Sequence, residues 1–297
     1  MSKILAVCLG GTISSATDNK VIKLKGAPER SFWDKFKISE EIAFVTPILY
    51  SSENADIDMY KAAIKGTIKA IEEEKPDGVL ILHGTDSMVY FAQLAVRVMS
   101  YLKLPVVITG SMAPLDDTHS DGIRNVKYAL GLLSAAIASK SGNATFGIVF
   151  CDSFLGQSVF VQARQATGPD YYGEFKKHGG KGDITELSEK DAKAFLEGKT
   201  PKIMVIPAVP GFPFDKVDIS GCDALLIQSY HSGTADTKAL PMLLERASAA
   251  GVRIFLGSAP KKACRYLSQD ILSKAGVTSY SDITFEGAWA ETVIKSV

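Results

Sequence analysis

Short apolar runs alternate with helix-length amphipathic stretches along most of this 297-residue chain, and this pattern constrains its fold more than any other feature. The apolar runs are continuous rather than alternating in hydrophobicity, which indicates strands buried on both faces. They occupy residues 4–9, 78–82, 106–109, 146–150, 203–207, 224–227 and 254–256. Helices are predicted between them at residues 57–74, 87–102, 122–139, 188–198, 237–250 and 262–275. The pattern predicts an α/β fold built on a doubly wound, mostly parallel sheet.

The chain is longer than a usual single domain, so two domains are expected. The composition shifts to glycine and charge between Tyr171 and Thr200, most densely at residues 172–183. We therefore predict a larger N-terminal domain of residues 1–185, a linker region of residues 186–202, and a smaller C-terminal α/β domain of residues 203–297.

Charge and hydropathy limit the partners of the chain. Lysine plus arginine and aspartate plus glutamate each number 33, and a balanced charge argues against a nucleic-acid partner. No apolar run approaches membrane-spanning length. Met1, Ser2 and Lys3 lead directly into the first predicted strand, which is too short for a signal peptide. We expect a cytoplasmic protein without a membrane partner.

Neither a metal site nor a cofactor is predicted. The cysteines, Cys8, Cys151, Cys222 and Cys264, lie far apart without CxxC spacing or a nearby histidine pair, so structural roles are expected. The glycine turns of the chain lack both the GxGxxG pattern and the lysine of a phosphate-binding loop. These absences also argue against a nucleotide-binding protein.

Two glycine–threonine turns follow predicted strands, at Gly10-Gly11-Thr12 and at His83-Gly84-Thr85-Asp86. Ligands bind at the carboxyl edge of open parallel sheets, where such turns lie. Two hydroxyls beside a carboxylate favour a nucleophilic hydrolase over a generic binding protein. The alternative for Thr85 and Asp86 is capping of the helix that follows. The polar residues 14–20 are predicted to act as a lid over a small substrate.

Two more polar segments follow apolar runs. Ser52 is placed to donate its hydroxyl to a carboxylate, and Glu53 to accept from an ammonium group, although both could be polar caps of the next helix. Ser111 lies in Thr109-Gly110-Ser111, where a strand opens into a loop.

Four motifs together resemble one family. They are GGTI at residues 10–13, HGTDSM at 83–88, TGSMAP at 109–114 and SDG followed by asparagine at 120–125, and residues 280–288 add a match near the C-terminus. The chain resembles the bacterial-type L-asparaginases, which include cytoplasmic type I enzymes and glutaminase-asparaginases. The resemblance covers nearly the whole chain. It implies that the N-terminal domain is catalytic and that the protein is a homodimer or homotetramer with active sites between subunits.

The resemblance implies a threonine-based amidohydrolase that takes a small amino-acid substrate. Thr12 would attack the side-chain amide carbon of L-asparagine, which gives an acyl-enzyme, ammonia and finally L-aspartate. Thr85 and Asp86 would belong to the proton-transfer group. L-glutamine or a related ω-amide is the alternative substrate.

The resemblance also implies the groups that bind the substrate. Ser52 and Glu53 would hold its α-carboxylate and α-amino groups, with Asp86 sharing the amino group. Backbone N–H groups near Gly11, Thr85 and Ser111 would make the oxyanion and carboxylate contacts.

Two family residues are missing from the expected places. No tyrosine occurs between Thr12 and Tyr50, and no lysine occurs in residues 151–164. Arg164 or Gln162 stands where the lysine is expected, but arginine cannot act as a base and glutamine does not titrate. Other candidates for the missing group are Lys23, Lys25 and Tyr171. These departures favour a second hypothesis, a noncatalytic amino-acid-binding protein on the same fold.

The four histidines have different expected roles. His231, in the glycine-containing loop of residues 228–236, is either a proton carrier or a hydrogen-bonded structural residue. His83 is expected to be a packing residue, His119 lies in a polar loop, and His178 lies in the connection between the domains.

Overall fold

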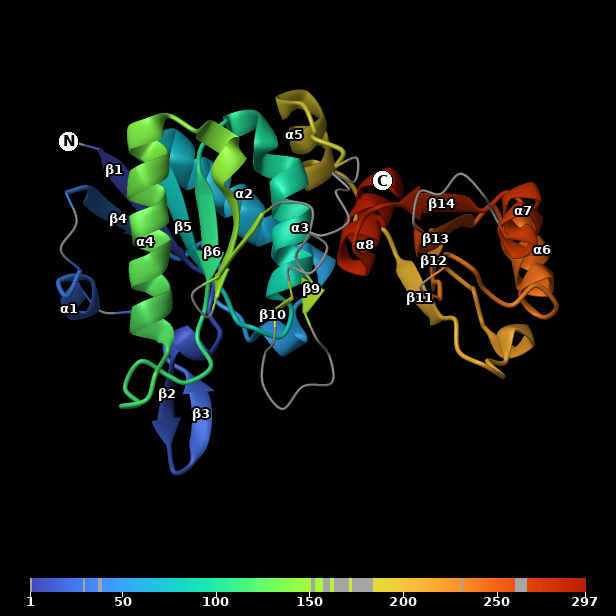
Figure 1. Cartoon of the computed structure of the whole chain (residues 1–297), viewed down its shortest axis with the longest axis horizontal. Coiled ribbons are helices and arrows are strands. Elements are labelled where there is room, and N and C mark those ends of the chain that lie inside the picture. Colours follow the sequence, from blue (N-terminus) through green and yellow to red (C-terminus); the bar gives the residue numbers. More distant parts are fainter. Residues whose placement is uncertain are drawn as a thin grey trace. The chain divides into compact units, whose positions relative to one another are not determined.

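The computed structural model describes residues 2–28, 30–36, 39–150, 153–156, 161–162, 171–172, 184–230, 232–259 and 266–297. The chain divides into two compact units. The N-terminal unit contains the described residues up to 172 together with 186–196, and the C-terminal unit contains 184–185 and 197–297. Each unit is built on its own sheet, mostly parallel in the N-terminal unit and parallel in the C-terminal unit (Figure 1).

The N-terminal unit contains a six-stranded sheet in the order β4-β1-β5-β6-β7-β8. The strands are β1 (Lys3–Cys8), β4 (Glu41–Val45), β5 (Gly78–Leu82), β6 (Val106–Thr109), β7 (Phe146–Phe150) and β8 (Ser153–Gly156). All neighbours pair in parallel except β8, which runs antiparallel to β7. The carboxyl ends of β1, β5 and β6 therefore meet at one edge of the sheet.

Helices cover both faces of this sheet. They are α1 (Arg30–Trp33), α2 (Ile57–Glu74), α3 (Met88–Met99), α4 (Gly122–Ser139) and α5 (Glu189–Glu197). One face packs on α4, where Ile4, Leu80 and Val107 of the strands share a core cluster with Val126 and Leu133 of the helix. Side chains alternate along a strand, so the residues between them point to the opposite face, which α2 and α3 cover. The sheet is doubly wound.

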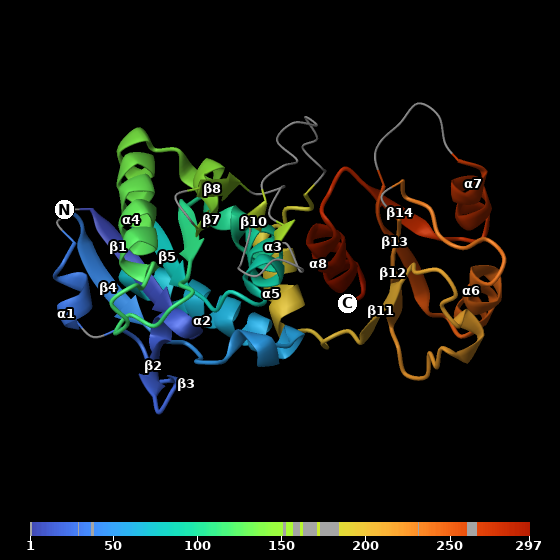
Figure 2. The same cartoon turned by 60° about the horizontal axis from the view of Figure 1, so that its bottom comes forward.

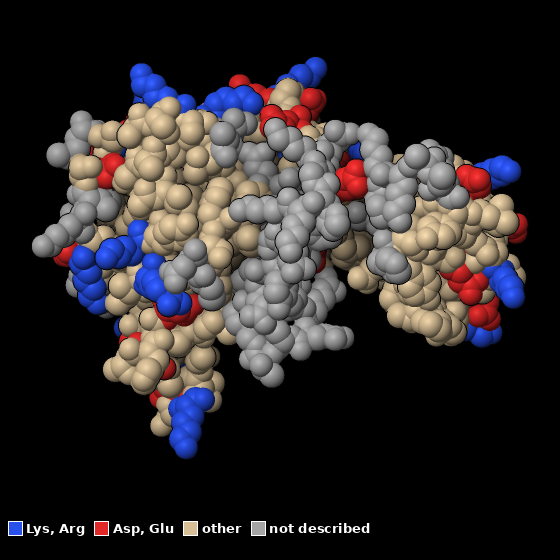
Figure 3. Space-filling view, in the orientation of Figure 1, with Lys and Arg blue, Asp and Glu red and all other residues tan. Residues whose placement is uncertain are grey.

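The segment that follows Thr12 forms a β-hairpin. Its strands, β2 (Ser15–Asp18) and β3 (Val21–Leu24), pair antiparallel and project from the carboxyl edge of the sheet (Figure 1). Asn19 and Lys20 form the turn with φ angles of 49° and 65°, the left-handed conformation that two-residue hairpin turns require. Basic side chains gather at the end of this projection (Figure 3). A lid role for residues 14–20 stays a prediction, but the segment is a regular hairpin.

The C-terminal unit repeats the same architecture on a smaller scale. Its sheet has the order β11-β12-β13-β14, with all strands parallel. The elements are β11 (Ile203–Pro207), β12 (Ala224–Gln228), β13 (Arg253–Ala259), β14 (Thr278–Ser281), α6 (Leu240–Ala249), α7 (Leu267–Lys274) and α8 (Phe285–Lys295). One core cluster joins the sheet to α6 and α7, and a second joins its other face to α8 (Figure 2).

The predicted fold class is confirmed, and most buried strands and long helices lie where the apolar pattern places them. Strands β4 and β14 are absent from the sequence prediction because both are edge strands with partly exposed, mixed side chains. Helix α6 begins at Leu240 rather than residue 237, since the Asp236 carboxylate accepts from the N–H groups of Lys238 and Ala239 and holds that segment as a turn. A short pair of strands, β9 (Val161–Gln162) and β10 (Tyr171–Tyr172), is antiparallel.

Helix α5 belongs to the N-terminal unit. The Leu187 N–H donates to the Arg97 carbonyl of α3, and the Lys61 ammonium of α2 lies over the Phe195 ring at 5.2 Å from its centroid. These contacts attach residues 186–196 to helices α2 and α3 of the N-terminal unit. The expected boundary at residue 185, with a linker to 202, stays a prediction.

Candidate active site

Four turns at the carboxyl edge of the N-terminal sheet pack against one another backbone to backbone. A Cβ atom on Gly11 would lie 2.1 Å from the Cα of Gly84, and one on Gly84 would lie 2.4 Å from the Ser52 Oγ. A Cβ atom on Gly10 would lie 2.1 Å from the Tyr50 carbonyl oxygen. Such distances leave no space for any side chain. Gly110, in the turn after β6, also packs closely, since a Cβ atom there would lie 2.4 Å from the His83 carbonyl oxygen. The glycines therefore bring together the turns that follow β1, β4, β5 and β6.

Thr12 begins a 3-10 turn, Thr12–Ser14, directly after Gly11. Gly11 has a φ of 81° and a ψ of −174°, a backbone conformation that only glycine adopts readily. Ile13 and Ser14 are buried, and Ser14 Oγ lies 3.0 Å from the Cys8 Sγ. Burial raises the pKa of the Cys8 thiol, which keeps it protonated. These anchors hold Thr12 half-buried at the sheet edge.

Thr85 and Asp86 lie in the turn between β5 and α3. Thr85 is buried and Asp86 is exposed. Helix α3 begins at Met88 with Ser87 as its N-cap residue, and Ser87 Oγ donates to the Ser52 carbonyl at 2.7 Å. Thr85 and Asp86 therefore precede the helix cap.

Ser52 and Glu53 lie in a 3-10 turn, Ser52–Asn54, after β4. The cap of α2 is Asp56, whose carboxylate accepts from the Met59 N–H at 2.8 Å, so neither Ser52 nor Glu53 caps this helix. The buried Ser52 hydroxyl donates to Asp86 Oδ2 at 3.3 Å. Glu53 and Asp86 expose two carboxylates that can accept from an ammonium group.

The Ser111 loop is held by the start of α4. Asp121 Oδ1 accepts from the Met112 N–H at 2.8 Å, and its Oδ2 accepts from the Asn125 side chain at 2.9 Å. Asn125 also donates to the Gly110 carbonyl at 3.0 Å. Ser111 Oγ donates to the Ala113 carbonyl at 2.7 Å, so its proton is used inside the loop. The structure thus gives a role to the SDG-and-asparagine motif, which is to brace this loop.

His83 and Tyr50 form a buried pair behind these turns. The Tyr50 hydroxyl lies 2.8 Å from His83 Nε2, and His83 Nδ1 lies 2.7 Å from the Gly84 carbonyl oxygen. Burial lowers the pKa of His83 to about 4 and raises that of Tyr50. His83 is buried, as predicted, whereas Tyr50 was not expected from the sequence. The signal available was its position, since Tyr50 precedes Ser52 by two residues just as His83 precedes Thr85.

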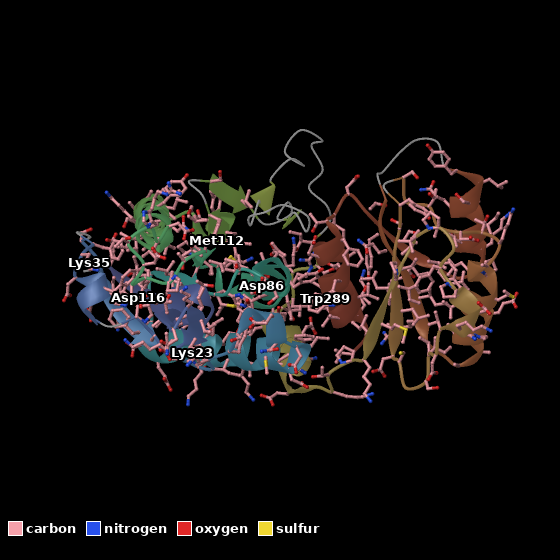
Figure 4. All side chains as sticks on the ribbon, turned by 90° about the horizontal axis from the view of Figure 1, so that it is seen from below. Lys23, Lys35, Asp86, Met112, Asp116 and Trp289 are labelled. Carbon is pink, nitrogen blue, oxygen red and sulfur yellow. The ribbon has the colours of Figure 1, made fainter. Side chains whose placement is uncertain are left out.

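Figure 4 looks onto this edge from below, with Asp86 and Met112 labelled on the turns after β5 and β6 and Lys23 on the hairpin. The structure therefore gathers Thr12, Thr85, Asp86, Ser52, Glu53, Gly11 and Ser111 at one sheet edge. Their roles in binding and chemistry remain predictions.

Several other candidates are placed differently. Lys23 forms an ion pair with Asp18 across the hairpin, 2.7 Å between Nζ and Oδ2. Lys25 is exposed, and its backbone N–H donates to the Ser14 carbonyl. His119 is exposed beside Asp117. Arg164, His178 and His231 lie outside the described residues, as do the side chains of Gln162 and Tyr171.

Two further findings concern metal and membrane roles. In the described part of the chain, no group of three histidine, cysteine, aspartate or glutamate residues could hold a metal ion. None of the helices in the described ranges is long and apolar enough to cross a membrane.

Comparison with known proteins places this site in a family. The family model described as Asparaginase, N-terminal, matches residues 3–171, more than half of the chain. The chain belongs to the asparaginase family. The match spans the N-terminal sheet, with the turns at Thr12, Ser52, Thr85 and Ser111.

Individual proteins of known name also resemble this chain, at low sequence identity. The chain is 28% identical to a glutamyl-tRNA(Gln) amidotransferase subunit from Methanosarcina acetivorans, over 82% of this chain and 61% of that protein. It is 27% identical to L-asparaginase 1 of Escherichia coli K12, over 81% of this chain and 74% of that enzyme. The crystal structure of L-asparaginase I from Vibrio cholerae matches with a TM-score of 0.70 at 21% identity, over 99% of this chain and 92% of that one. The chain thus spans less than two thirds of the amidotransferase protein.

Proposed function

We propose that this protein is an amidohydrolase that hydrolyses L-asparagine to L-aspartate and ammonia, with Thr12 as the nucleophile. The observation that carries the proposal is the contact of Gly11 with Gly84, because it brings the turns of Thr12 and Thr85 together at the edge of the sheet. Membership of the asparaginase family supports the same chemistry.

The proposed reaction uses the hydroxyl of Thr12 in two steps. Its oxygen attacks the side-chain amide carbon, the C–N bond breaks, and the Thr12 proton leaves with the nitrogen as ammonia. Water then hydrolyses the ester, which releases L-aspartate and restores the hydroxyl. Thr85 and the Asp86 carboxylate are the proposed proton-transfer groups. Ser52, by donating to Asp86 Oδ2, limits the orientations of that carboxylate.

The same carboxylates suit an amino-acid substrate. Glu53 and Asp86 are the proposed acceptors for its α-ammonium group. Ser52 is the proposed donor to its α-carboxylate, for which its hydroxyl proton turns from Asp86 Oδ2 to the substrate. Backbone N–H groups near Gly11, Thr85 and Ser111 are the proposed donors to the oxyanion. The site requires no cofactor for this hydrolysis.

The test is ammonia release by the purified protein and by variants at position 12. We expect Thr12→Ala to lower kcat at least 1,000-fold, roughly the effect of removing a nucleophile, and Thr12→Ser to keep part of it because serine retains the hydroxyl. Hydroxylamine should trap the acyl group as aspartyl hydroxamate with the wild type and not with Thr12→Ala. Equal ammonia release by Thr12→Ala and the wild type would exclude Thr12 as the nucleophile.

The range of substrates is a second measurement. L-glutamine and related ω-amides carry the same reacting group on a different chain, and one relative belongs to a glutamyl-tRNA(Gln) amidotransferase. Ammonia release from L-asparagine, L-glutamine and their D-isomers should rank L-asparagine first by kcat/KM. A larger kcat/KM for L-glutamine would reassign the substrate.

The second candidate is a noncatalytic amino-acid-binding protein. The absence of lysine from residues 151–164 favours it, because the predicted proton-transfer group then lacks a titratable amine. Calorimetry that detects L-aspartate or L-asparagine binding without any ammonia release would support this candidate. We also expect a cytoplasmic homodimer or homotetramer, and light scattering of the purified protein measures its oligomeric state.

A further inference from the structure

A buried tyrosine–histidine pair connects two of the turns that form the candidate site. Tyr50 is 5% exposed and His83 is fully buried, and their side chains meet at 2.8 Å between Oη and Nε2. The His83 ring stacks on Phe91 with centroids 4.8 Å apart, and the Tyr60 ring lies 6.2 Å from it. A polar pair enclosed by aromatic rings is costly to bury unless its hydrogen bonds are made.

The hydrogen bonds of the pair have a single consistent direction. The Gly84 carbonyl oxygen can only accept, so His83 Nδ1 carries the proton and donates to it. The apolar surroundings keep the imidazole neutral, which leaves Nε2 as an acceptor for the Tyr50 O–H. The chain of bonds runs from the Tyr50 hydroxyl through His83 to the Gly84 backbone.

The two ends of this chain lie directly before the two polar turns. Tyr50 lies two residues before Ser52, and Gly84 lies directly before Thr85. The backbones of both residues of the pair are themselves anchored in the sheet, since the Tyr50 N–H donates to the Leu9 carbonyl and the His83 N–H donates to the Thr109 carbonyl. The sheet thus fixes the start of each turn, and the Tyr50–His83 bond is the side-chain link between the two starts.

We propose that Tyr50 and His83 are positioning residues that set the spacing between the amino-acid-binding segment, Ser52 and Glu53, and the turn of Thr85 and Asp86. This inference rests on the proposed function of that site. The bonds from Ser52 to Asp86 and from Ser87 to Ser52 cross the same gap nearer to the surface. The pair supports these bonds from the buried side. Because both side chains are buried, the pair acts through these turns.

Tyr50→Phe is the sharpest test, because it removes one hydroxyl and keeps the ring. We expect the KM for L-asparagine and the Kd for L-aspartate to rise about tenfold, which corresponds to about 1.4 kcal/mol or one hydrogen bond. We expect kcat to change less than threefold, because Gly11 packs directly on Gly84 and keeps the turns of Thr12 and Thr85 together without Tyr50. A purely structural role would lower stability without changing KM or Kd.

Tyr280→Phe is the matched control. Tyr280 is 6% exposed in the C-terminal unit, and its hydroxyl accepts from Thr292 Oγ1 at 3.3 Å. The same chemical change there should leave KM and Kd within a factor of two. His83→Gln is the second variant, since an amide can donate and accept in place of the imidazole. We expect it to bind L-aspartate more tightly than His83→Leu.

The outcomes separate this inference from the proposed function. Turnover by the wild type with an unchanged KM and Kd in Tyr50→Phe overturns the positioning role and leaves the function standing. If the wild type binds L-aspartate without turnover, the amidohydrolase proposal fails, and a tenfold rise in Kd in Tyr50→Phe supports the positioning role. If Tyr280→Phe shifts Kd as much as Tyr50→Phe does, the positioning role is wrong. A wild type that neither turns over L-asparagine nor binds L-aspartate overturns both proposals.

Discussion

The two parallel sheets of this chain share an architecture but differ at their carboxyl edges. In the N-terminal unit, Gly11 and Gly84 lie where a Cβ atom would come within 2.1–2.4 Å of another turn. In the C-terminal unit, Gly211 follows β11 with a φ of 76°, and a Cβ atom there would meet nothing within 4 Å. The same open space surrounds Gly221 and Gly251, which precede β12 and β13 with positive φ. Glycine lets one turn touch another at the N-terminal edge. Gly211 in the C-terminal unit serves only chain reversal, and the tight glycine described there, Gly257 within β13, packs on Phe285, where a Cβ atom would still keep 3.0 Å.

The polar side chains differ in the same way. At the N-terminal edge they join turns that are distant in sequence, as Ser52 and Asp86 or Tyr50 and His83 do. In the C-terminal unit, the distant contact at the corresponding edge runs from a side chain to the backbone, since Ser229 Oγ donates to the Gly257 carbonyl at 3.0 Å. The exposed Asp218 bonds only to a residue two positions away. Close contact between glycine turns, more than the parallel sheet itself, therefore locates the candidate site.

The largest expected effect comes from adding one methyl group at matched glycines. Gly11→Ala should destabilise the N-terminal unit by about 3 kcal/mol, roughly half from its φ of 81° and half from the clash with Gly84, and should lower kcat/KM at least 100-fold. Gly211→Ala has a φ of 76° in open space and should cost only about 1 kcal/mol, without loss of activity. Urea denaturation and ammonia release measure both. If both variants lose the same free energy of unfolding, close packing at Gly11 does not distinguish the N-terminal edge from the C-terminal one.

The two units can be followed separately in that measurement. The chain has two tryptophans, Trp33 in α1 of the N-terminal unit and Trp289 in α8 of the C-terminal unit. In a Trp289→Phe background, tryptophan fluorescence reports unfolding of the N-terminal unit. In a Trp33→Phe background it reports the C-terminal unit.

Acid should act on the N-terminal edge through His83. The pKa of His83 is about 4 in the folded protein and near 6.5 in the unfolded chain, so the unfolded chain binds the additional proton between these values. The stability from His83 is therefore fully present above pH 6.5 and is lost as the pH falls toward 4. Between pH 7 and pH 5 the loss should be about 2 kcal/mol. Urea denaturation in the Trp289→Phe background checks this, and His83→Gln should flatten that part of the pH profile.

A smaller effect is expected from the brace behind Ser111. Asp121→Ala leaves the Met112 N–H and one bond of Asn125 without their acceptor and should cost about 1.5 kcal/mol, with a KM raised several-fold. Asp218→Ala removes an exposed aspartate that also accepts from a backbone N–H, in the other unit. It should cost under about 0.5 kcal/mol. A KM unchanged in Asp121→Ala would show that the loop keeps its position without the brace.

Much of the fold follows from local pattern. The strands β5, β6 and β7 and the helices α2 and α4 lie at the predicted residues, because continuous apolar runs and long amphipathic stretches report burial directly. The edge strand β4 and the hairpin of β2 and β3 were not predicted, since many of their side chains are exposed to solvent. Their pairing depends on tertiary contacts more than on local hydrophobicity.

The candidate site also has a part that local sequence predicts and a part that depends on tertiary contacts. Turn chemistry and motif spacing are local properties, so the residue types at the strand ends, Thr12, Ser52 and the Thr85-Asp86 pair, could be identified from the chain alone. Three contacts could not be identified from the chain alone. They are Gly11 on Gly84, Ser52 with Asp86, and Tyr50 with His83.

These contacts join segments separated by more than 30 residues, and they form only when parallel strands align their carboxyl ends. The alignment is set by the register of β1 against β4 and β5, which place the same ends of the strands side by side. Register within the sheet is a property of the packed core. This register brings the turns together, and it cannot be predicted from any single local segment of the chain.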